Sequence, residues 1–258
     1  MKLLSTALAS LSLMATTVVH AERASGASAA SPGDVRSVAP ALERYAQDVL
    51  LGDVWKRPGL SARDRGVVTA AALIARNQTA EMAAYFDRAL DSGVKPAELS
   101  EIITHLAFYS GWGNAMAAVS VAKNVYAERK IGADQLPPAS PELLPLDKAA
   151  EAQRAARVEQ DVGPLSQGVV QYTGDVLFKD LWLRPALAPR DRSLVTVTAL
   201  IASGQVAQIP YHLNRAMDNG LTKPEVSEML AHLAFYVGWP NVFTAIPVVK
   251  GVVEKRPA

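Results

Sequence analysis

The chain carries one stretch of sequence twice. Residues Glu98 to Asn114 and Glu225 to Asn241 are identical at 11 of 17 positions, and most differences exchange one apolar residue for another. His105 aligns with His232, an offset of 232 − 105 = 127 residues. The same offset holds without a gap back to residue 45, so the chain is an internal duplication. Each candidate functional residue therefore has a counterpart against which it can be compared.

Length and composition indicate a globular protein. The 258 residues can hold one large domain or two of about 100 residues each. A hydrophobic content of 50% with 20% charged residues argues against disorder, and a formal net charge of +1 gives no electrostatic reason to expect nucleic acid binding. The chain has four histidines and no cysteine, which excludes disulfides, a thiolate nucleophile and a CxxC redox pair.

The amino terminus predicts export. Lys2 precedes an apolar run from Leu3 to Val19, and Val19-His20-Ala21 places small residues at the −3 and −1 positions of a cleavage site. We interpret residues 1–21 as a secretory signal peptide cleaved after Ala21. The alternative is an uncleaved membrane anchor, but the run is short and diluted by serine and threonine. We expect an exported protein, periplasmic or secreted, with no membrane association after cleavage.

The remaining sequence indicates a leader, two repeats and a connection between them. Residues 22–40 are rich in Ala, Ser and Gly and predict a flexible leader. The first repeat is predicted at 41–130 and the second at 161–258. The connection, 131–160, has four prolines between Leu136 and Pro145, followed by a helical pattern from Lys148 to Gln160. That helix is either an exposed linker or the first helix of the second repeat.

The periodicity predicts an all-α fold built from two tandem helical repeats. Ser61 stands three residues before Asp64, as in a capping box, and the following run VVTAAALIA is apolar on all sides, as in a buried helix. Further helices are expected at 41–51, 78–90, 96–111 and 114–129. Gly93 stands at a helix carboxyl end, and no convincing alternation typical of strands occurs.

Aromatic residues of the duplicated helix bear on assembly. Its apolar stripe consists of Leu99, Ile102, Ile103 and Leu106. Phe108 projects to the opposite side, as does Phe235 in the second copy. This arrangement indicates either a second packing partner, the other repeat or another subunit, or a phenylalanine buried locally within one repeat. Trp112 and Trp239 are expected in the core rather than in a substrate-binding wall.

Three motifs resemble the carboxymuconolactone decarboxylase family. They are LxxRDRxLVTVTALIASGQ from Leu187, HLNRAMDNG from His212, and TKPEVSEMLAHLAFYVGWPN from Thr222. The resemblance covers both repeats, roughly 45–129 and 172–256. It implies the all-α, alkylhydroperoxidase D-like fold of that family and an oligomer whose sites are lined by adjacent copies. A chain with two repeats would then form a homo-oligomer with fewer subunits than a family member with one repeat per chain, and we expect a trimer.

One branch of the family consists of peroxidases with a CxxCxxxH motif. The histidine of that motif falls on His212. The two cysteines would fall on Gln205 and Gln208, and in the first repeat on Gln78 and Glu81. Because neither an amide nor a carboxylate can undergo thiol–disulfide exchange, peroxidase activity of this type is disfavoured.

The decarboxylase branch has Glu-x-x-x-His at the same place. The first repeat has Glu81 but carries Tyr85 in the histidine position, whereas the second has Gln208 but keeps His212. Either a composite site combines Glu81 with His212, or one or both sites have decayed. The resemblance implies that Glu81 and His212 are catalytic and that Tyr85 and Gln208 contact substrate.

The chemistry of decarboxylation favours His212 as the general acid/base. The reaction needs cationic groups for the carboxylate and the developing enolate, together with an acid poised near neutral pH, and it needs no metal or organic cofactor. Histidine meets the second requirement without a large pKa shift, whereas Tyr85 is a poor base near neutral pH. The alternative for His212 is a histidine held by a hydrogen bond in the core or at an interface.

Matched histidines and arginines are further candidates. His105 and His232 each follow a glutamate by four residues, which places each pair on one helix face. A shared structural role is the most economical interpretation; pocket lining and metal binding are alternatives, and two ligands per repeat are too few for a closed metal site. Arg63, Arg190 and Arg192 lie at helix starts, where they form either a carboxylate site or surface pairs with neighbouring aspartates.

We therefore expect an exported, cofactor-independent, carboxymuconolactone decarboxylase-like enzyme acting on a small anionic or lactone-like molecule. The alternative from a different class is a non-catalytic binding or scaffold protein that retains the fold.

Overall fold

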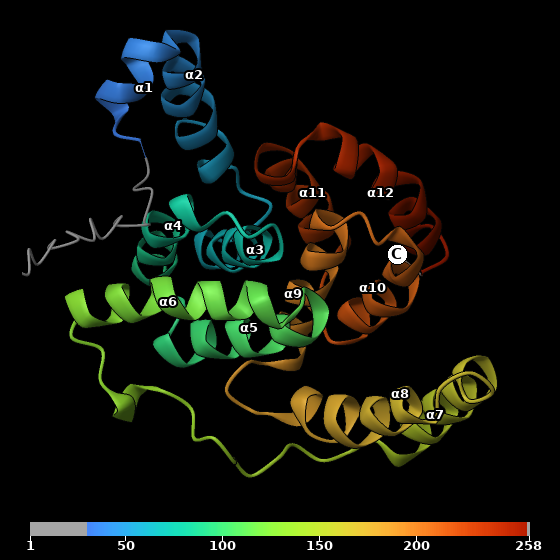
Figure 1. The fold of residues 1–258 in the computed structure, drawn as a ribbon. Coiled ribbons are helices and arrows are strands. Elements are labelled where there is room, and N and C mark those ends of the chain that lie inside the picture. The colour runs from blue at the N-terminus through green and yellow to red at the C-terminus, as the bar shows by residue number, and fades with distance from the viewer. Residues whose placement is uncertain (1–29, 257–258) are drawn as a thin grey trace, which may run out of the picture.

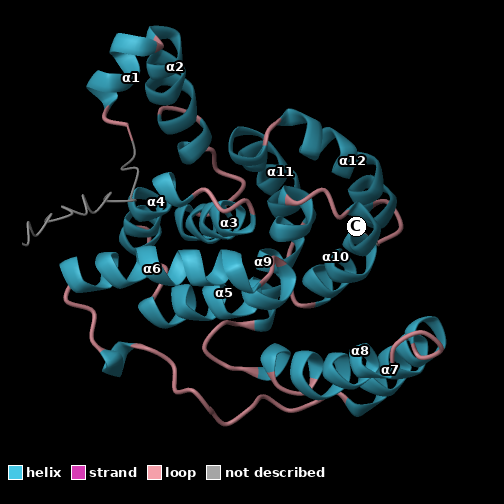
Figure 2. Cartoon of the chain, in the orientation of Figure 1, coloured by secondary structure: helices cyan, strands magenta, loops and turns pink. Residues whose placement is uncertain are grey.

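The computed structural model describes residues 30–256. The predicted signal peptide, and all of the predicted leader before residue 30, lie outside this range. The described part of the predicted leader is not irregular, because residues Pro32–Val38 form a helix whose amino end is capped by Ser31. Within the described range every regular element is helical, which confirms the all-α fold (Figure 2). None of the helices in this part of the chain combines the length and the apolar character needed to cross a membrane.

The first repeat is a short arm followed by four longer helices (Figure 1). The arm comprises α1 (Pro32–Val38), α2 (Pro40–Tyr45) and the π-helical turn η1 (Ala46–Leu51), and a 3-10 turn, η2 (Val54–Lys56), leads into the body. The four helices are α3 (Ala62–Ala75), α4 (Thr79–Asp91), α5 (Pro96–Tyr109) and α6 (Trp112–Glu128). In Figure 1 the arm extends away from the body.

The second repeat reproduces this order. It comprises α8 (Gln167–Tyr172), η4 (Thr173–Phe178), η5 (Leu181–Leu183), α9 (Pro189–Ala202), η6 (Val206–Gln208), α10 (Ile209–Asp218), α11 (Lys223–Val237) and α12 (Trp239–Val253). The helices α9, α11 and α12 begin at residues 189, 223 and 239, each 127 after the starts of α3, α5 and α6 at 62, 96 and 112. The duplication seen in the sequence is thus a duplication of structure.

Local signals explain where the helices begin and end. The Ser61 hydroxyl accepts a hydrogen bond from the Asp64 amide at 3.0 Å, which caps α3 as predicted. Gly93 follows α4 with φ of 98°, and Gly111 separates α5 from α6 with φ of 91°, conformations that favour glycine. In the second repeat Thr222 and Glu225 form a complete capping box at the start of α11.

The inter-repeat connection contains one short turn, η3 (Ala133–Gln135), and one helix, α7 (Lys148–Val162). Residues 136–147 have no regular structure, as their prolines predicted. Arg184 fixes this segment by donating hydrogen bonds to the carbonyls of Ala139 at 2.9 Å and Pro138 at 3.1 Å. The helix α7 packs beside α8 along one edge of the molecule (Figure 1), so it forms part of the second repeat's surroundings rather than an isolated linker.

Helices α3 and α9 lie at the centre and pack against each other. The duplicated helices cross over: α11 of the second repeat packs on α3, and α5 of the first repeat packs on α9 (Figure 1). Both central helices are buried along nearly their whole length, as an all-round apolar sequence requires. The buried apolar side chains form one continuous cluster across both repeats, so the two halves share a single core.

Ion pairs link the amino-terminal ends of α3 and α9. Arg63 donates to Asp191 at 2.7 Å, and Arg190 donates to Asp64 at 2.8 Å, so each repeat pairs its arginine with the other repeat's aspartate. Glu98 and Glu225 complete the network at 2.6 and 2.7 Å from the same two arginines. Both aspartate side chains are more than nine-tenths buried, and their position in the first helical turn also favours a negative charge.

The tryptophans that follow the glycines are exposed, and the expectation that they lie in the core is wrong. Trp112 is 65% and Trp239 is 50% exposed. Each is the first residue of the next helix, because the positive φ of Gly111 or Gly238 redirects the chain outward there. Phe108 is 42% exposed and contacts the Trp112 ring, with centroids 5.9 Å apart.

The crossed ion pairs give a measurable prediction. Removing Arg190 with Arg190→Met leaves the buried Asp64 carboxylate short of one partner, and we expect a loss of about 2 kcal/mol in the free energy of unfolding. This is less than for a fully buried pair because Arg190 is 20% exposed. A double-mutant cycle with Asp64→Ala, measured by urea denaturation, should give a coupling energy of about 1–2 kcal/mol.

The pair of Arg157 and Asp161 on α7 serves as a control for that cycle. Its side chains are 83% and 61% exposed, so we expect a coupling energy of about 0.5 kcal/mol or less. Equal coupling energies for the two pairs would mean that the crossed ion pairs do not hold the repeats together.

Candidate functional site

The duplication creates two related side-chain clusters at the boundary between the repeats. The His212 cluster consists of His212, Trp182, Tyr109, His105, Phe178, Tyr211, Arg154 and Arg215. The Tyr85 cluster consists of Tyr85, Trp55, Tyr236, His232 and Arg88. Each takes a histidine and a tyrosine from the duplicated helix of one repeat and the remaining side chains mainly from the other repeat. Both clusters therefore depend on the crossing of α5 and α11.

His105 has a fixed structural role at the base of the His212 cluster. The Thr196 hydroxyl donates to the Arg192 carbonyl at 2.9 Å, so it accepts from His105 Nε2–H at 2.7 Å. His105 Nδ1 then accepts from Arg192 at 3.4 Å. Burial and the Arg192 charge hold the pKa of His105 well below its ordinary value. This neutral, fully partnered ring agrees with the structural role that the sequence favoured for the matched histidines.

His232 repeats the arrangement in the Tyr85 cluster. Its Nε2 lies 2.8 Å from the Thr69 hydroxyl, and its Nδ1 faces an Arg65 nitrogen at 3.5 Å. Because a guanidinium only donates, Nδ1 accepts and Nε2 carries the hydrogen. Burial, with the nearby Arg65, lowers the pKa of His232 to about 3. Both predicted histidines thus lie within the clusters, but neither has an unpartnered ring nitrogen.

The predicted substrate-binding arginines are occupied by carboxylates of the protein. Arg192 is fully buried and pairs with Glu101 at 2.9 Å, and Arg184 binds the same carboxylate at 2.8 Å. Arg63 and Arg190 belong to the crossed ion pairs described above. A substrate carboxylate would have to displace these internal partners, so the contacts favour a structural role for all three.

His212 and Tyr85 occupy equivalent positions but present different chemistry. The His212 ring stacks on Trp182 with centroids 5.8 Å apart, and Tyr85 stacks on Trp55 at 6.3 Å. The N–H group of each indole donates a hydrogen bond to a tyrosine hydroxyl. Trp182 donates to Tyr109 at 2.9 Å, and Trp55 donates to Tyr236 at 2.8 Å. Burial raises the pKa of Tyr85, so even less of its basic phenolate form is present near neutral pH.

His212 has an unsatisfied ring nitrogen. Its side chain is largely buried, with 7% of the residue exposed, and among residues 30–256 its Nδ1 has no hydrogen-bond partner. Burial, followed by the nearby Arg215 charge, lowers the pKa of His212 to about 4, so the ring is neutral at pH 7. A buried polar atom without a partner costs about 1–3 kcal/mol, and a nitrogen left open to an incoming ligand is one explanation for such a cost.

The structure does not bring Glu81 and His212 into one cluster. Glu81 lies one turn before Tyr85 on α4 and is exposed. Tyr85 contacts Trp55 and Tyr236, whereas His212 contacts a separate set of rings. A composite site would need α4 and α10 in one cluster, but each cluster combines one of these helices with the other repeat's duplicated helix. Gln208 is exposed, at the end of η6, just ahead of α10.

The His212 cluster has aromatic and cationic groups that the Tyr85 cluster lacks. Phe178 stacks on Trp182 with centroids 6.0 Å apart, and Tyr211 contacts His212 at 5.0 Å. The positions 127 residues earlier are Leu51 and Ala84. The sequence analysis missed both aromatic residues, and a residue-by-residue comparison of the repeats for unmatched aromatics would have found them.

Metal ligands do not gather in either cluster. Over the described residues, no three His, Asp, Glu or Cys side chains come together in a way that would hold a metal ion. The groups in the His212 cluster suit proton transfer and anion binding, because they combine a neutral imidazole with nearby guanidinium groups.

The buried histidines predict a pH-dependent stability. Below the ordinary histidine pKa of about 6.5 the unfolded chain binds protons that folded His105, His212 and His232 do not. The free energy of unfolding should therefore fall as the pH falls from about 6.5, by up to roughly 1.4 kcal/mol per pH unit for each histidine. Urea denaturation at pH 7, 6 and 5 measures this slope.

A variant isolates the histidine contribution. His232→Gln should reduce the slope between pH 6 and pH 5, because one titrating group is gone while an amide donor to Thr69 remains. Stability that is the same at pH 7 and pH 5 would contradict the burial of neutral histidines.

Sequence comparisons identify the family. The sequence model of the carboxymuconolactone decarboxylase family matches residues 40–124 and 167–251. The 4-carboxymuconolactone decarboxylase of Acinetobacter baylyi is 31% identical over 81 residues, which are 31% of this chain and 60% of that protein. The nitrosuccinic acid decarboxylase npaB of Metarhizium robertsii is 31% identical over 74 residues, 29% of this chain and 52% of that protein. The chain thus spans only about half to three-fifths of the length of these curated relatives.

A solved structure gives a weaker likeness. A protein of Burkholderia xenovorans assigned as a gamma-carboxymuconolactone decarboxylase subunit has a TM-score of 0.48 and 19% identity, covering 88% of this chain and 92% of that one. The family match, by contrast, extends over both repeats and more than half of the sequence. This chain belongs to the carboxymuconolactone decarboxylase family.

Proposed function

We propose that this protein decarboxylates a small anionic or lactone-like molecule without a cofactor, and that His212 is the general acid/base. The observation that carries the proposal is the unpartnered Nδ1 of His212, beside Arg215 and within a cluster of aromatic rings. The names of the two curated relatives, both decarboxylases acting on small acids, support the same reaction class.

The proposed reaction needs a proton and a cation at one place. When the bond to the departing carboxylate breaks, CO₂ leaves and its electron pair passes into a conjugated lactone or a similar acceptor. The product forms when a proton is delivered to carbon, so the reaction consumes one proton. The Arg215 charge would stabilise the developing enolate. A bound anion would also oppose the effect of Arg215 on the pKa of His212, so the ring would hold a proton more readily in the complex.

The proposal assigns one working site to each chain. Tyr85 cannot exchange protons readily near neutral pH. Glu81 lies one turn before Tyr85 on α4, away from His212, so we assign it no catalytic role beside His212. Gln208 is exposed one turn before His212 and is retained as a candidate substrate contact. His105 and His232 are assigned to the scaffold because their ring nitrogens are all engaged.

Replacement of His212 tests the mechanism. We expect His212→Ala to lower kcat/KM by about 10²-fold or more, the usual contribution of a general acid/base. The assay follows the loss of absorbance of 4-carboxymuconolactone and, separately, CO₂ release from nitrosuccinate. The control is Asn214→Ala on the same helix, whose amide bonds to the backbone carbonyl of Pro210. Full activity of a folded His212→Ala protein would remove this residue from the mechanism.

A non-catalytic binding protein is the second candidate. The observation that favours it is that neither cluster carries both the glutamate and the histidine of the family motif. It would be supported by a chain that binds small carboxylates but releases no CO₂ from either compound.

Two further proposals concern location and assembly. We propose that residues 1–21 direct export to the periplasm or beyond the cell, on the sequence argument given above. We also propose that the chain forms a trimer through two exposed apolar stripes. The stripes consist of Phe108, Trp112, Met116 and Val119 on α5 and α6, and Trp239, Phe243 and Ile246 on α12. Duplicated exposed aromatic residues of this kind are typical of subunit interfaces.

A charge within each stripe should disrupt the assembly. We expect the double variant Trp112→Glu and Trp239→Glu to dissociate into monomers, because a carboxylate is costly to bury at an interface. Light scattering during size-exclusion chromatography gives the mass. Leu165→Glu, at a residue that is 92% exposed and lies outside both stripes, should leave the mass unchanged. A native protein that is already monomeric would contradict the proposal.

A further inference from the structure

Three buried polar atoms of the His212 cluster lack hydrogen-bond partners. They are Arg154 Nη1, Arg215 Nε and His212 Nδ1, all without a partner among the described residues. The Arg154 side chain is more than nine-tenths buried, at 8% exposed. Guanidinium nitrogens are strong donors, so each of these two could bind an acceptor that the described residues do not supply.

The two guanidinium groups lie near one common aromatic ring, that of Phe178. The Arg154 Cζ atom lies 4.2 Å from the centroid of the Phe178 ring, and the Arg215 Cζ atom lies 5.8 Å from the same centroid. These distances limit the separation of the two Cζ atoms to 10 Å. The Arg215 Cζ atom is also 4.3 Å from the centroid of Trp182, the indole on which His212 stacks.

Tyr109 lies close enough to both guanidinium groups for their charges to affect its pKa. Burial is the dominant effect and raises the pKa of Tyr109, whereas the Arg215 and Arg154 guanidinium groups act in the opposite direction. Tyr109 also contacts the His212 ring, with centroids 5.3 Å apart, so this one side chain lies near the imidazole and both cations.

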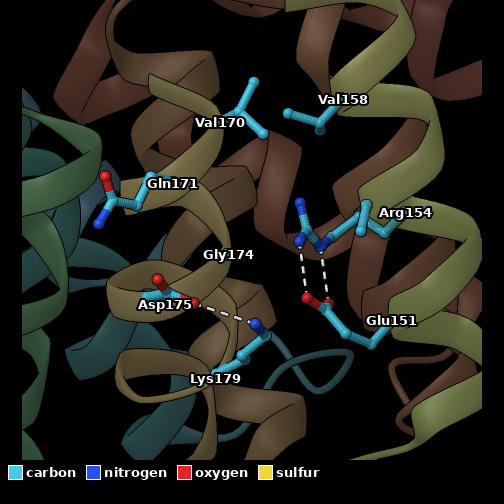
Figure 3. A pocket seen from close by; sticks show the side chains of 9 residues that line it. Glu151, Arg154, Val158, Val170, Gln171, Gly174, Asp175 and Lys179 are labelled. Atoms are coloured by element: carbon cyan, nitrogen blue, oxygen red, sulfur yellow. Dashed lines mark hydrogen bonds and ion pairs between the residues drawn. The ribbon is translucent and has the colours of Figure 1, made fainter. Parts of the chain in front are cut away.

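Arg154 also lines a pocket. The pocket has a volume of about 190 Å³ and lies between α7 on one side and α8 and η4 on the other (Figure 3). At roughly 30 Å³ per water molecule, it has room for several waters or a small organic acid. Figure 3 shows Glu151, one turn before Arg154 on α7, accepting two hydrogen bonds from Arg154, each 2.7 Å long. Arg154 therefore lines this pocket and also contacts Phe178 of the His212 cluster, whereas Arg215 and His212 do not line the pocket.

We propose that Arg154, from the inter-repeat helix, acts with Arg215 to bind a carboxylate of the substrate, and that Glu151 occupies Arg154 while the site is empty. The inference rests on the proposed function in that the carboxylate belongs to the molecule on which His212 acts. Arg154 Nη1 and Arg215 Nε are free to donate to the incoming carboxylate, and displacement of Glu151 would release two further donors.

This arrangement makes the two clusters inequivalent. Arg154 lies on α7, outside the duplicated region, so the first repeat has no counterpart of it. The Tyr85 cluster has Arg88, the counterpart of Arg215, with its Cζ atom 4.9 Å from the Trp55 centroid. The second cation is thus a property of the His212 cluster, and the chain should bind one such carboxylate.

Calorimetric titration with succinate tests the inference without relying on catalysis, because succinate is a saturated acid that offers no acceptor for decarboxylation. We expect one site per chain. Arg154→Gln should weaken succinate binding about tenfold or more, as expected for the loss of a charged hydrogen-bond donor. Arg154→Lys should be intermediate because it keeps the charge but not the planar fork.

Glu151→Gln gives the sharpest expectation, since it removes the internal competitor. Succinate should bind several-fold more tightly to this variant, an effect that a purely structural role of the Glu151–Arg154 pair would not produce. The matched control is Arg157→Gln on the same helix, where the arginine is 83% exposed, and its affinity should equal that of the native chain. Urea denaturation of each variant verifies that it is folded.

The outcomes separate the inference from the proposed function. Unchanged affinity in Arg154→Gln, weaker binding in Glu151→Gln, or no saturable binding of succinate to the native chain would overturn the role of Arg154. An equal loss of affinity in Arg88→Gln would also overturn it, because binding would then involve the other cluster. Loss of succinate binding in Arg154→Gln together with full decarboxylation by His212→Ala would support the inference while removing the proposed mechanism.

Discussion

The structure depends on a buried ion pair between Glu101 and Arg192, which come from different repeats. Their side chains are 1% and 0% exposed, and the charged groups lie 2.9 Å apart. An unpaired charge at such depth would cost several kcal/mol, so neither repeat can close its core without the other. In the symmetric position Arg65 lies 3.4 Å from Glu228, which it shares with the more exposed Arg57. The same pairings bring α5 and α11 across the boundary and thereby create both clusters.

This dependence explains which residues differ between the repeats. The glutamate, histidine and tyrosine of each duplicated helix bond to the arginine, threonine and tryptophan of the other repeat, so changing one would leave a buried partner unsatisfied. The position of His212 and Tyr85 is different, because each ring is held largely by stacking on an indole. An indole can stack on an imidazole or on a phenol. The residue at this position can therefore differ between the two clusters without leaving a buried partner unsatisfied.

Sequence reasoning succeeded where the cause is local. The cap at Ser61, the glycine after α4 and the irregular proline-rich connection depend on neighbouring residues, and each was found from the sequence. It did less well where partners are distant. Arg63 and Arg190 stand beside aspartates in the sequence, but each also binds the aspartate of the opposite repeat. Glu81 and His212 together would complete the glutamate–histidine motif of the family, yet helix crossing places His212 in one cluster and leaves Glu81 next to the other, one turn before Tyr85. No local pattern encodes which helices cross.

Arg154 could not be found by comparing the repeats, because it lies outside the duplicated region. A chain with two repeats has one inter-repeat connection, and α7 belongs to it. That helix approaches the His212 cluster through Phe178 and brings a cation to it, whereas the first repeat begins with an arm that extends from the body (Figure 1). Joining two copies in one chain thus supplies a segment that can complete only one of two otherwise similar clusters. The cluster that carries the histidine rather than the tyrosine is also the one that the connecting helix α7 reaches. The proposed proton-transfer group, His212, and the proposed anion-binding group, Arg154, therefore lie in the same half of the molecule.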